Sequence, residues 1–142
     1  MDVLRPISSI MSTDLICLSP HNTIADVHDV FHKNRIHHIP IVVEDALVGM
    51  VSKADYLYFR KGFIEDKVDR EIDSLRLSAY NVEQIMTTGL ATLESNSRIS
   101  VAIEIFKENL FHAIPIVDNE KLTGILTTFD IINELSVTNV SS

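Results

Sequence analysis

His37-His38-Ile39-Pro40-Ile41-Val42 returns 75 positions later as His112-Ala113-Ile114-Pro115-Ile116-Val117, and this repetition decides the fold. Aligned at the same offset, residues 10–57 and 85–132 share 16 identities in 48 positions without a gap. Most of the remaining pairs exchange similar side chains. The chain is therefore a tandem duplication, and we expect the two halves to fold in the same way.

Each half predicts the same order of strands and helices. In the first half, the apolar run at 15–18 predicts a buried strand, and apolar residues with helical spacing follow at 24–31. Residues 39–43 and 47–52 predict two strands joined by a polar turn, and a second helix is expected to begin just before Asp55. The second half repeats this order with strand 90–93, helical positions Ile99, Ala102, Phe106 and Leu110, strands 114–117 and 122–127, and a helix before Asp130.

The predicted fold class is α/β (α+β), with two β-α-β-β-α motifs. Asn22-Thr23 and Ser97 stand where the N-caps of the first helix in each half are expected. One motif of about 50 residues buries too little surface to be stable alone. We therefore expect the two motifs to pack around a pseudo-twofold axis as a single module over residues 1–142.

The segment between the repeats predicts an inserted connector helix. Ile64, Val68, Ile72 and Leu75 form an apolar stripe at helical spacing, with charged residues on the other faces. The stripe either packs on its own domain or contacts a second copy or a partner. The predicted organisation is a first motif at 7–59, a linker helix at 60–81 and a second motif at 82–137.

Composition excludes several functional classes. The 142 residues carry a net charge of −8, which argues against general binding to nucleic acid or to an anionic membrane. The start of the sequence lacks the pattern of a signal peptide, and no apolar run is long enough to span a bilayer. The one cysteine, Cys17, permits no intrachain disulfide and no cysteine metal site. These features predict a cytoplasmic protein.

With these motifs, the sequence resembles the CBS-domain family, specifically a stand-alone tandem pair, or Bateman module. The matching features are Ile10-Met11 and Ile85-Met86 before the first predicted strand, and the Ile-Pro-Ile-Val strand of each half. Each half also ends on Gly-x-x-Ser/Thr-x-x-Asp, at residues 49–55 and 124–130. No single piece is specific, but all of them occur in order, twice, at one offset.

The resemblance implies a regulatory module without catalytic activity. Similar proteins bind AMP, ADP, ATP or S-adenosylmethionine as regulatory ligands in two clefts, and many form homodimers. It implies no required cofactor. The ligand is expected to cause a conformational change that an effector protein, which the sequence does not name, senses.

In such a site, the final aspartate of each half is expected to bind ribose. A carboxylate is an acceptor only, so Asp55 and Asp130 are suited to the 2′,3′-diol. Ser52 and Thr127 lie at the start of the following helix, where hydroxyl and backbone N–H groups meet a phosphate. The alternative is that these four residues only cap the helix and complement its dipole.

Basic side chains near these positions are expected to face the phosphate. The resemblance implies this role for His37 and His112, and Lys53 adds a charge in the first half only. His38 has Ala113 as its counterpart, so the two clefts are not equivalent. The alternative for the histidines is a structural place at a strand edge. The first cleft is the better equipped for a phosphate.

The adenine is expected to lie against the first predicted strand of each half, mainly on backbone groups, with Ile39 or Ile114 covering one face. The predicted ligand-binding set is Ile16, Cys17, His37, His38, Ile39, Pro40, Ser52, Lys53 and Asp55 in the first half, and Ala91, Thr92, His112, Ala113, Ile114, Pro115, Thr127 and Asp130 in the second.

Three other interpretations are possible. His28 and His32 have the i, i+4 spacing of a metal site that His21 or Asp29 would complete, but their aligned counterparts are not ligands, so no metal is expected. No catalytic motif is present, so an enzyme is not expected. The serious alternative is a ligand-independent dimeric scaffold that binds a partner through the connector helix.

Overall fold

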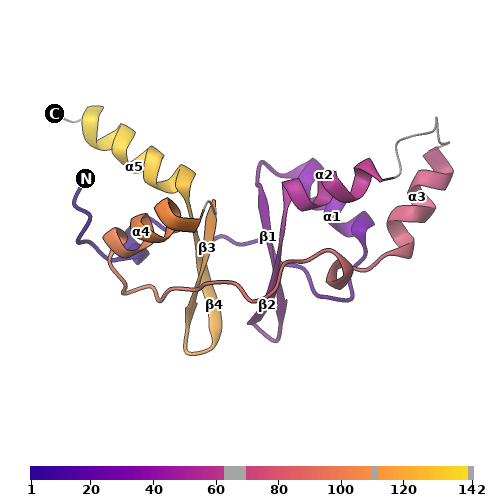
Figure 1. Cartoon of the computed structure of the whole chain (residues 1–142), viewed down its shortest axis with the longest axis horizontal. Helices are drawn as coiled ribbons and strands as arrows, with labels where there is room; N and C mark the ends of the chain where they lie inside the picture. Colours follow the sequence, from indigo (N-terminus) through magenta and orange to yellow (C-terminus); the bar gives the residue numbers. More distant parts are fainter. Residues whose placement is uncertain (63–69, 110–111, 141–142) are drawn as a thin grey trace. The chain divides into compact units, whose positions relative to one another are not determined.

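The computed structural model describes residues 1–62, 70–109 and 112–140. The chain forms two compact units, Met1–Leu15 with Leu90–Ser142 and Ile16–Gly89. The leading segment of each repeat therefore belongs to the unit that contains the hairpin of the other repeat (Figure 1).

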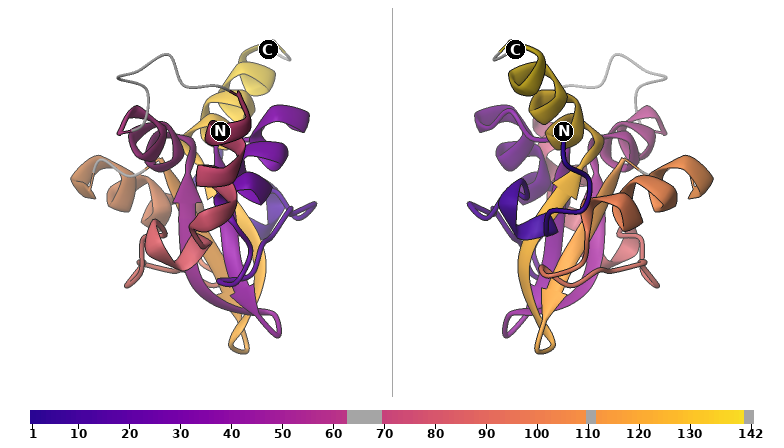
Figure 2. Two further views of the ribbon diagram at one scale, coloured as in Figure 1. Left: turned by 90° about the vertical axis from the view of Figure 1, so that its right-hand side faces the viewer. Right: turned by 90° about the vertical axis from the view of Figure 1, so that its left-hand side faces the viewer.

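Each unit contains one antiparallel hairpin with helices around it. In both views of Figure 2, the turn of the first hairpin projects away from the helices of its unit. The unit Ile16–Gly89 contains α1 (Ile24–Lys33), β1 (His38–Val43), β2 (Ala46–Ser52), α2 (Lys53–Lys61), α3 (Arg70–Ala79) and the 3-10 helix η2 (Val82–Gln84). The other unit contains the 3-10 helix η1 (Ile7–Ser9), α4 (Ile99–Asn109), β3 (Ala113–Asp118), β4 (Lys121–Thr127) and α5 (Thr128–Val140).

The two hairpins confirm the predicted second and third strands of each half. β1 pairs with β2, and β3 with β4, in the same register. Both hairpins turn on two residues with positive φ, Glu44 and Asp45 (49° and 69°) and Asn119 and Glu120 (50° and 66°). Two consecutive left-handed residues are typical of a type I′ turn, whose twist matches that of the strands.

The predicted first strand of each half is wrong. Leu18 makes one parallel bridge to β1, with its N–H donating to Pro40 and its carbonyl accepting from Val42 (3.1 and 2.9 Å). Leu93 makes the equivalent bridge to β3. The apolar run of the first half thus pairs its backbone with the hairpin through Leu18, and Pro20, which has no N–H, follows soon after.

Crossing of the leading segments over the hairpins explains two glycines of the repeat. The N–H of Thr87 donates to the carbonyl of Met50 (2.8 Å), and Ser12 bonds to β4 in the same way. A Cβ at Gly49 would lie 2.6 Å from Sδ of Met86. A Cβ at Gly124 would lie 2.7 Å from Sδ of Met11. These contacts are closer than a Cβ atom normally makes, so a larger residue in either strand would displace the methionine of the crossing segment.

Helix N-caps agree with the sequence in the first half only. Thr23 caps α1 in a capping box with Asp26, as predicted. Ser97 is not a cap, because α4 begins at Ile99. The backbone of Ser97 has other partners: its N–H donates to Glu94 (3.0 Å) and its carbonyl accepts from Ile7 (2.8 Å).

The connector helix packs through a different face from the predicted stripe. On α3 the buried side chain is Leu77, which lies in the core with residues of α1 and β1. Ile72 and Leu75 are exposed. The other two stripe residues, Ile64 and Val68, lie outside the described residues. The prediction that the stripe packs against its own domain is therefore wrong for Ile72 and Leu75, the two members that the structure describes.

Candidate functional site

The two aspartates predicted to bind ribose lie at the starts of α2 and α5, each in a reciprocal cap. Oδ2 of Asp55 accepts the N–H of Ser52, and Oγ of Ser52 accepts the N–H of Asp55, both at 3.0 Å. Asp130 and Thr127 make the same pair of bonds at 2.9 and 3.1 Å. The capping role is therefore present in both halves, and it occupies one oxygen of each carboxylate.

The second carboxylate oxygen differs between the two halves. Oδ1 of Asp130 accepts a bond from the hydroxyl of Ser12 (3.4 Å). Within the described ranges, no residue bonds to Oδ1 of Asp55. The counterpart of Ser12 is Thr87, which lies beside β2. Asp55 thus keeps an acceptor available at the surface, whereas the acceptor of Asp130 already has a donor.

Sequence reasoning missed Ser12 as a neighbour of Asp130, and it missed the counterpart Thr87 as a neighbour of β2. Both residues belong to the repeated Ile-Met-Ser/Thr-Thr segment, so the sequence marks them as equivalent. Spacing alone does not show that each segment crosses to the hairpin of the other repeat. The two backbone bonds that place Ser12 beside β4 measure 2.8 and 2.9 Å.

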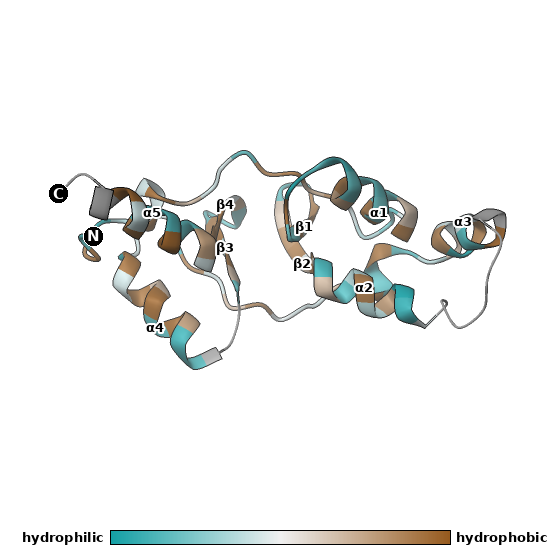
Figure 3. Ribbon diagram, turned by 90° about the horizontal axis from the view of Figure 1, so that it is seen from above, coloured by the Kyte–Doolittle hydropathy of each residue, from teal (hydrophilic) through white to brown (hydrophobic). Residues whose placement is uncertain are grey.

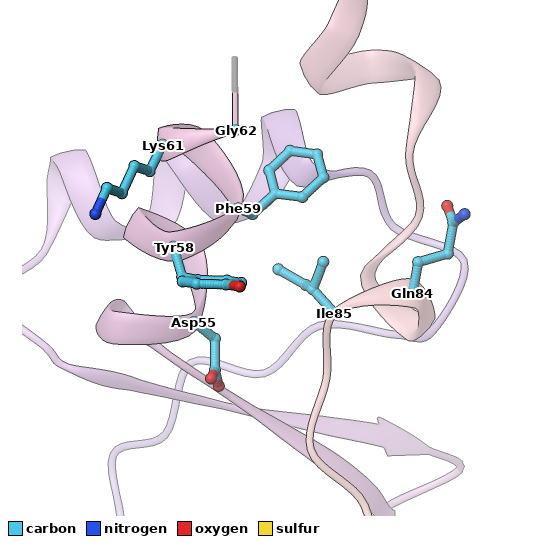
Figure 4. A pocket seen from close by; sticks show the side chains of 7 residues that line it. All are labelled: Asp55, Tyr58, Phe59, Lys61, Gly62, Gln84 and Ile85. Carbon is cyan, nitrogen blue, oxygen red and sulfur yellow. The ribbon is translucent and has the colours of Figure 1, made fainter. Parts of the chain in front are cut away.

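A groove of about 780 Å³ opens beside Asp55. It lies within one unit, between α2 and the end of η2. In Figure 4 the ring of Tyr58 extends toward Ile85, the carboxylate of Asp55 lies below that ring, and Lys61 points to the opposite side. The lining residues combine a carboxylate, two aromatic rings, an amide and a cation: Asp55, Tyr58, Phe59, Lys61, Gly62, Gln84 and Ile85. Of these, only Asp55 was predicted.

The predicted phosphate-facing residues lie next to the helix starts. The carbonyl of His37 accepts the first N–H of α2, from Lys53 (2.8 Å), and both side chains are exposed. His112 makes the same bond to Thr128 at the start of α5 (3.0 Å). His38 is directly opposite Ser52 in the hairpin register. In the first half, the backbone thus places Ser52, Lys53 and the two histidines next to one another at the start of α2.

In the second half, the counterparts around the helix start carry fewer donors. Ala113 lies opposite Thr127 in the register, where the first half has a histidine. Thr128 replaces the lysine at the first helical position. The start of α5 therefore lacks the lysine and one of the two histidines that adjoin the start of α2.

Ile39 and Ile114, which the sequence predicts to cover the base, are core residues in the structure. Both side chains are buried in the cores of their units, with 0% and 1% exposed. Pro40 and Pro115 are also buried, and their carbonyls accept from Leu18 and Leu93. The side chain of Ile39 lies in a core cluster with residues of α1, and that of Ile114 in a cluster with residues of α4.

The remaining predicted base contacts are more accessible. Ile16, Ala91 and Thr92 are exposed, and Cys17 is half-buried. Burial, followed by the charge of Asp45, raises the pKa of the Cys17 thiol. The thiol therefore stays protonated at neutral pH, which disfavours a redox role.

The histidines considered as metal ligands have other contacts. Nδ1 of His28 is hydrogen-bonded to the hydroxyl of Tyr56, and the ring of His32 stacks on His28 with centroids 5.2 Å apart. No cluster of potential metal ligands occurs in the parts of the chain that the structure describes. Over the same residues, no helix is long and apolar enough to cross a bilayer.

Comparison with known proteins identifies the family. Residues 7–62 and 82–137 each match the CBS domain. The chain belongs to the CBS-domain family. The duplication is therefore a pair of CBS motifs, and the mixed helix-and-strand fold is that of a CBS pair.

Solved CBS pairs share this fold over nearly the whole chain. CBSX2 in complex with AMP superposes with a TM-score of 0.78 at 20% identity, covering 95% of this chain and 98% of that one. The CBS pair of MJ0100, in complex with 5′-methylthioadenosine and S-adenosyl-L-methionine, gives a TM-score of 0.74 at 21% identity, covering 95% and 98%.

Curated relatives are longer than this CBS pair. Inosine-5′-monophosphate dehydrogenase of Thermoplasma acidophilum is 29% identical over 125 residues, which are 87% of this chain and 22% of that enzyme. The protein MJ1225 of Methanocaldococcus jannaschii is 26% identical over 138 residues, which are 93% of this chain and 48% of that protein. The chain thus spans between about a fifth and half of these relatives.

Proposed function

We propose that this CBS pair is a regulatory module that binds an adenine nucleotide or S-adenosylmethionine, with Asp55 as the ribose acceptor. Ligand binding changes the conformation of the pair, and a partner protein responds to that change. Two related folds support the ligand class, because one binds AMP and the other binds S-adenosylmethionine and 5′-methylthioadenosine.

The observation that carries the proposal is the divided role of the Asp55 carboxylate. Oδ2 holds the start of α2 through Ser52, which fixes the carboxylate in one orientation. Oδ1 faces no hydrogen-bond donor within the described ranges, and the carboxylate lines the groove. A rigid, accessible acceptor suits a pair of ribose hydroxyls, because less conformational entropy is lost on binding when the acceptor is already fixed.

In the proposed site, groups around the start of α2 bind the phosphate. Lys53 supplies a positive charge, and His37 and the hydroxyl of Ser52 supply donors next to the helix N-terminus. The partial positive charge of a helix N-terminus favours an anion there. Because the Asp130 site lacks the lysine, we expect the phosphate-bearing ligands to prefer the Asp55 site.

A regulatory role without catalysis fits the extent of the similarities. The match to inosine-5′-monophosphate dehydrogenase covers only 22% of that enzyme. Two CBS pairs of similar size match this chain over 95% of its length. One is in complex with AMP, and the other is in complex with 5′-methylthioadenosine and S-adenosyl-L-methionine. We propose that the chain acts as a homodimer on an effector protein.

Thermal unfolding with and without ligand tests the proposal. AMP, ADP, ATP and S-adenosylmethionine are added separately at millimolar concentration, with and without magnesium. A ligand at a hundredfold excess over its dissociation constant stabilises the native state by about 2.7 kcal/mol, a rise of several degrees in a protein of this size. The Asp55→Ala variant is expected to lose most of this rise, and Asp130→Ala much less.

The control is Asp26→Ala. Asp26 caps α1 with the same reciprocal bonds, accepting the N–H of Thr23 at 2.9 Å, but it does not line the groove. Both variants lose a cap, and only Asp55→Ala removes the ribose acceptor. The proposal fails if no adenine ligand raises the melting temperature of the wild type. A ligand-independent scaffold would then be favoured, with the exposed residues Ile72 and Leu75 of α3 as its contact surface.

A further inference from the structure

The groove beside Asp55 has an aromatic wall that the proposed ribose contact leaves unused. On α2, Asp55, Tyr58 and Phe59 follow the i, i+3, i+4 spacing that places side chains on one side of a helix. Gln84 and Ile85, at the end of η2, line the groove from the other side. Figure 3 shows both hydrophilic and hydrophobic positions along α2. The groove thus offers an acceptor and apolar surface within a single compact unit.

The ring of Tyr58 is an open platform in this groove. It is 82% exposed, and the aromatic contacts of α2 in the described part of the chain involve Tyr56 and Phe59 instead. In Figure 4 the ring extends toward Ile85, with the carboxylate of Asp55 below it. Exposed aromatic rings of this kind bind nucleic-acid bases by stacking, because every base has a flat π-face.

The order of groups along α2 matches the order of groups in a nucleotide. Ser52 and Lys53 lie at the helix start, Asp55 follows, and Tyr58 lies about one turn later. In a nucleotide the ribose joins the phosphate to the base, so a ribose at Asp55 with its phosphate at the helix start directs the base toward Tyr58. Side chains at i and i+3 are about 5–6 Å apart at their Cβ atoms. A base attached to that ribose therefore reaches the ring.

Gln84 presents hydrogen-bond donors to the same groove. Its Oε1 accepts the N–H of Asn81 at 2.7 Å in the cap of η2. This bond orients the amide and leaves the NH2 group, which only donates, for a ligand. The ring nitrogens of a purine, such as N3 and N7 of adenine, are acceptors. The amide of Gln84 thus complements an edge of the base that Tyr58 would stack on.

The second half has no equivalent platform. The counterparts of Tyr58 and Gln84 are Asn133 and Ser9, which carry neither a ring nor an amide of that length. In the first half, the side chain of Ile39 lies in the core, so another apolar group must meet the face of a base there. Tyr58 is an exposed side chain of the groove that has a suitable face.

We propose that Tyr58 stacks on the base of the nucleotide held by Asp55, with the NH2 group of Gln84 donating to a ring nitrogen, and that this pair selects purines over pyrimidines. A purine has two fused rings and covers more of the Tyr58 ring than a pyrimidine does, so it buries more apolar surface. This inference rests on the proposed function and adds the residues that read the base.

Calorimetry with AMP, CMP and ribose 5-phosphate tests the proposal, because these ligands share the ribose phosphate and differ in the base. We expect the wild type to bind AMP at least tenfold more tightly than CMP. Tyr58→Ala should weaken AMP at least tenfold and ribose 5-phosphate less than twofold, and Tyr58→Phe should restore most of the loss. Leu57→Ala is the matched control, because it truncates an exposed side chain of the same helix outside the groove and should change no affinity.

Gln84→Glu tests the amide separately. The carboxylate still accepts the N–H of Asn81, so the cap of η2 remains while the NH2 donor is lost. The added negative charge acts on AMP and on ribose 5-phosphate alike. The ratio of their affinities therefore isolates the base contact, and we expect this ratio to fall at least threefold. An unchanged ratio would overturn the role of Gln84.

Fluorescence of 2-aminopurine riboside 5′-monophosphate gives a second readout, because stacking on an aromatic ring quenches it. We expect quenching by the wild type and by Leu57→Ala, and none by Tyr58→Ala. Asp55→Ala should weaken AMP and CMP by the same factor, since both carry the ribose. Equal AMP affinity of the wild type and Tyr58→Ala, with a loss in Asp55→Ala, would overturn the base contact and leave the proposed function standing. Absence of AMP binding to the wild type would overturn both.

Discussion

At the scale of single residues, the two halves differ most at the acceptor that each offers to a ligand. Asp55 and Asp130 have the same cap, yet only Asp130 accepts a bond from a serine hydroxyl of the crossing segment. The sequence predicted both aspartates as site residues from the repeat. It did not predict Ser12 beside Asp130, because that contact joins segments that are far apart in the chain.

The crossing segments make a prediction about the strand glycines. Gly49→Ala would place its Cβ 2.6 Å from Met86, so the methionine must move from a packed position. We expect a loss of about 1–3 kcal/mol in the free energy of unfolding, measured in urea. Gly62→Ala is the control, because the nearest atom to its Cβ lies at an ordinary 3.5 Å. The double variant Gly49→Ala with Met86→Ala should lose less stability than the sum of the losses of the two single variants. A loss equal to that sum would show that the clash with Met86 is not the cause.

At the scale of elements, α1, α2 and α3 are joined by a chain of polar contacts. The hydroxyl of Tyr56 bonds to Nδ1 of His28 on α1 and accepts from Nη1 of Arg60 (3.1 Å). Nη2 of Arg60 donates to Asp73 on α3 at 2.7 Å. The counterparts of His28, Tyr56 and Arg60 in the second repeat are all aliphatic. The first repeat thus has a polar link to α3, and the second repeat lacks the residues that would make an equivalent link.

Removal of the Tyr56 hydroxyl tests this link. Tyr56→Phe leaves His28 and Arg60 without a shared partner, and we expect a loss of about 1–2 kcal/mol in the free energy of unfolding. Tyr58→Phe, on an exposed ring of the same helix, should change it by less than about 0.5 kcal/mol. Equal effects of the two substitutions would mean that the link contributes nothing to stability.

The cap of α1 predicts a dependence on pH. The N–H of Thr23 and then the amide of Asn22 lower the pKa of Asp26 below its ordinary value. A lowered pKa in the folded state gives stability that is present above the unfolded pKa of about 3.9 and is lost as the pH falls through the folded value. The difference in urea midpoint between wild type and Asp26→Ala should therefore be constant from pH 5 to 7 and shrink below pH 4. A difference that stays constant to pH 2 would contradict this cause.

Elements that could be predicted are those specified by local sequence. The hairpins follow from the Ile-Pro-Ile-Val strands and their polar turns, and α1 from its apolar spacing and its cap at Thr23. The prediction of a first strand in each half was wrong because an apolar run does not show how many of its residues form backbone hydrogen bonds to a neighbouring strand. The prediction of the packed face of α3 was wrong because helical periodicity does not say which face meets the core. In the structure Leu77 lies in the core.

At the scale of the whole molecule, the repeats and the compact units do not coincide. Residues Met1–Leu15 belong with the second hairpin, and the segment that ends at Gly89 belongs with the first. A contiguous half of the chain therefore lacks the segment that covers its own hairpin. An isolated repeat would therefore leave its own hairpin without the segment that crosses it in the full chain.

The central claim is that Asp55 binds the ribose of an adenine ligand. Titration calorimetry with AMP measures this directly on wild type, Asp55→Ala and the cap control Asp26→Ala. We predict binding to the wild type, a loss of at least tenfold in affinity for Asp55→Ala, about 1.4 kcal/mol or more, and an unchanged affinity for Asp26→Ala. Equal affinity of the wild type and Asp55→Ala for AMP would contradict the account.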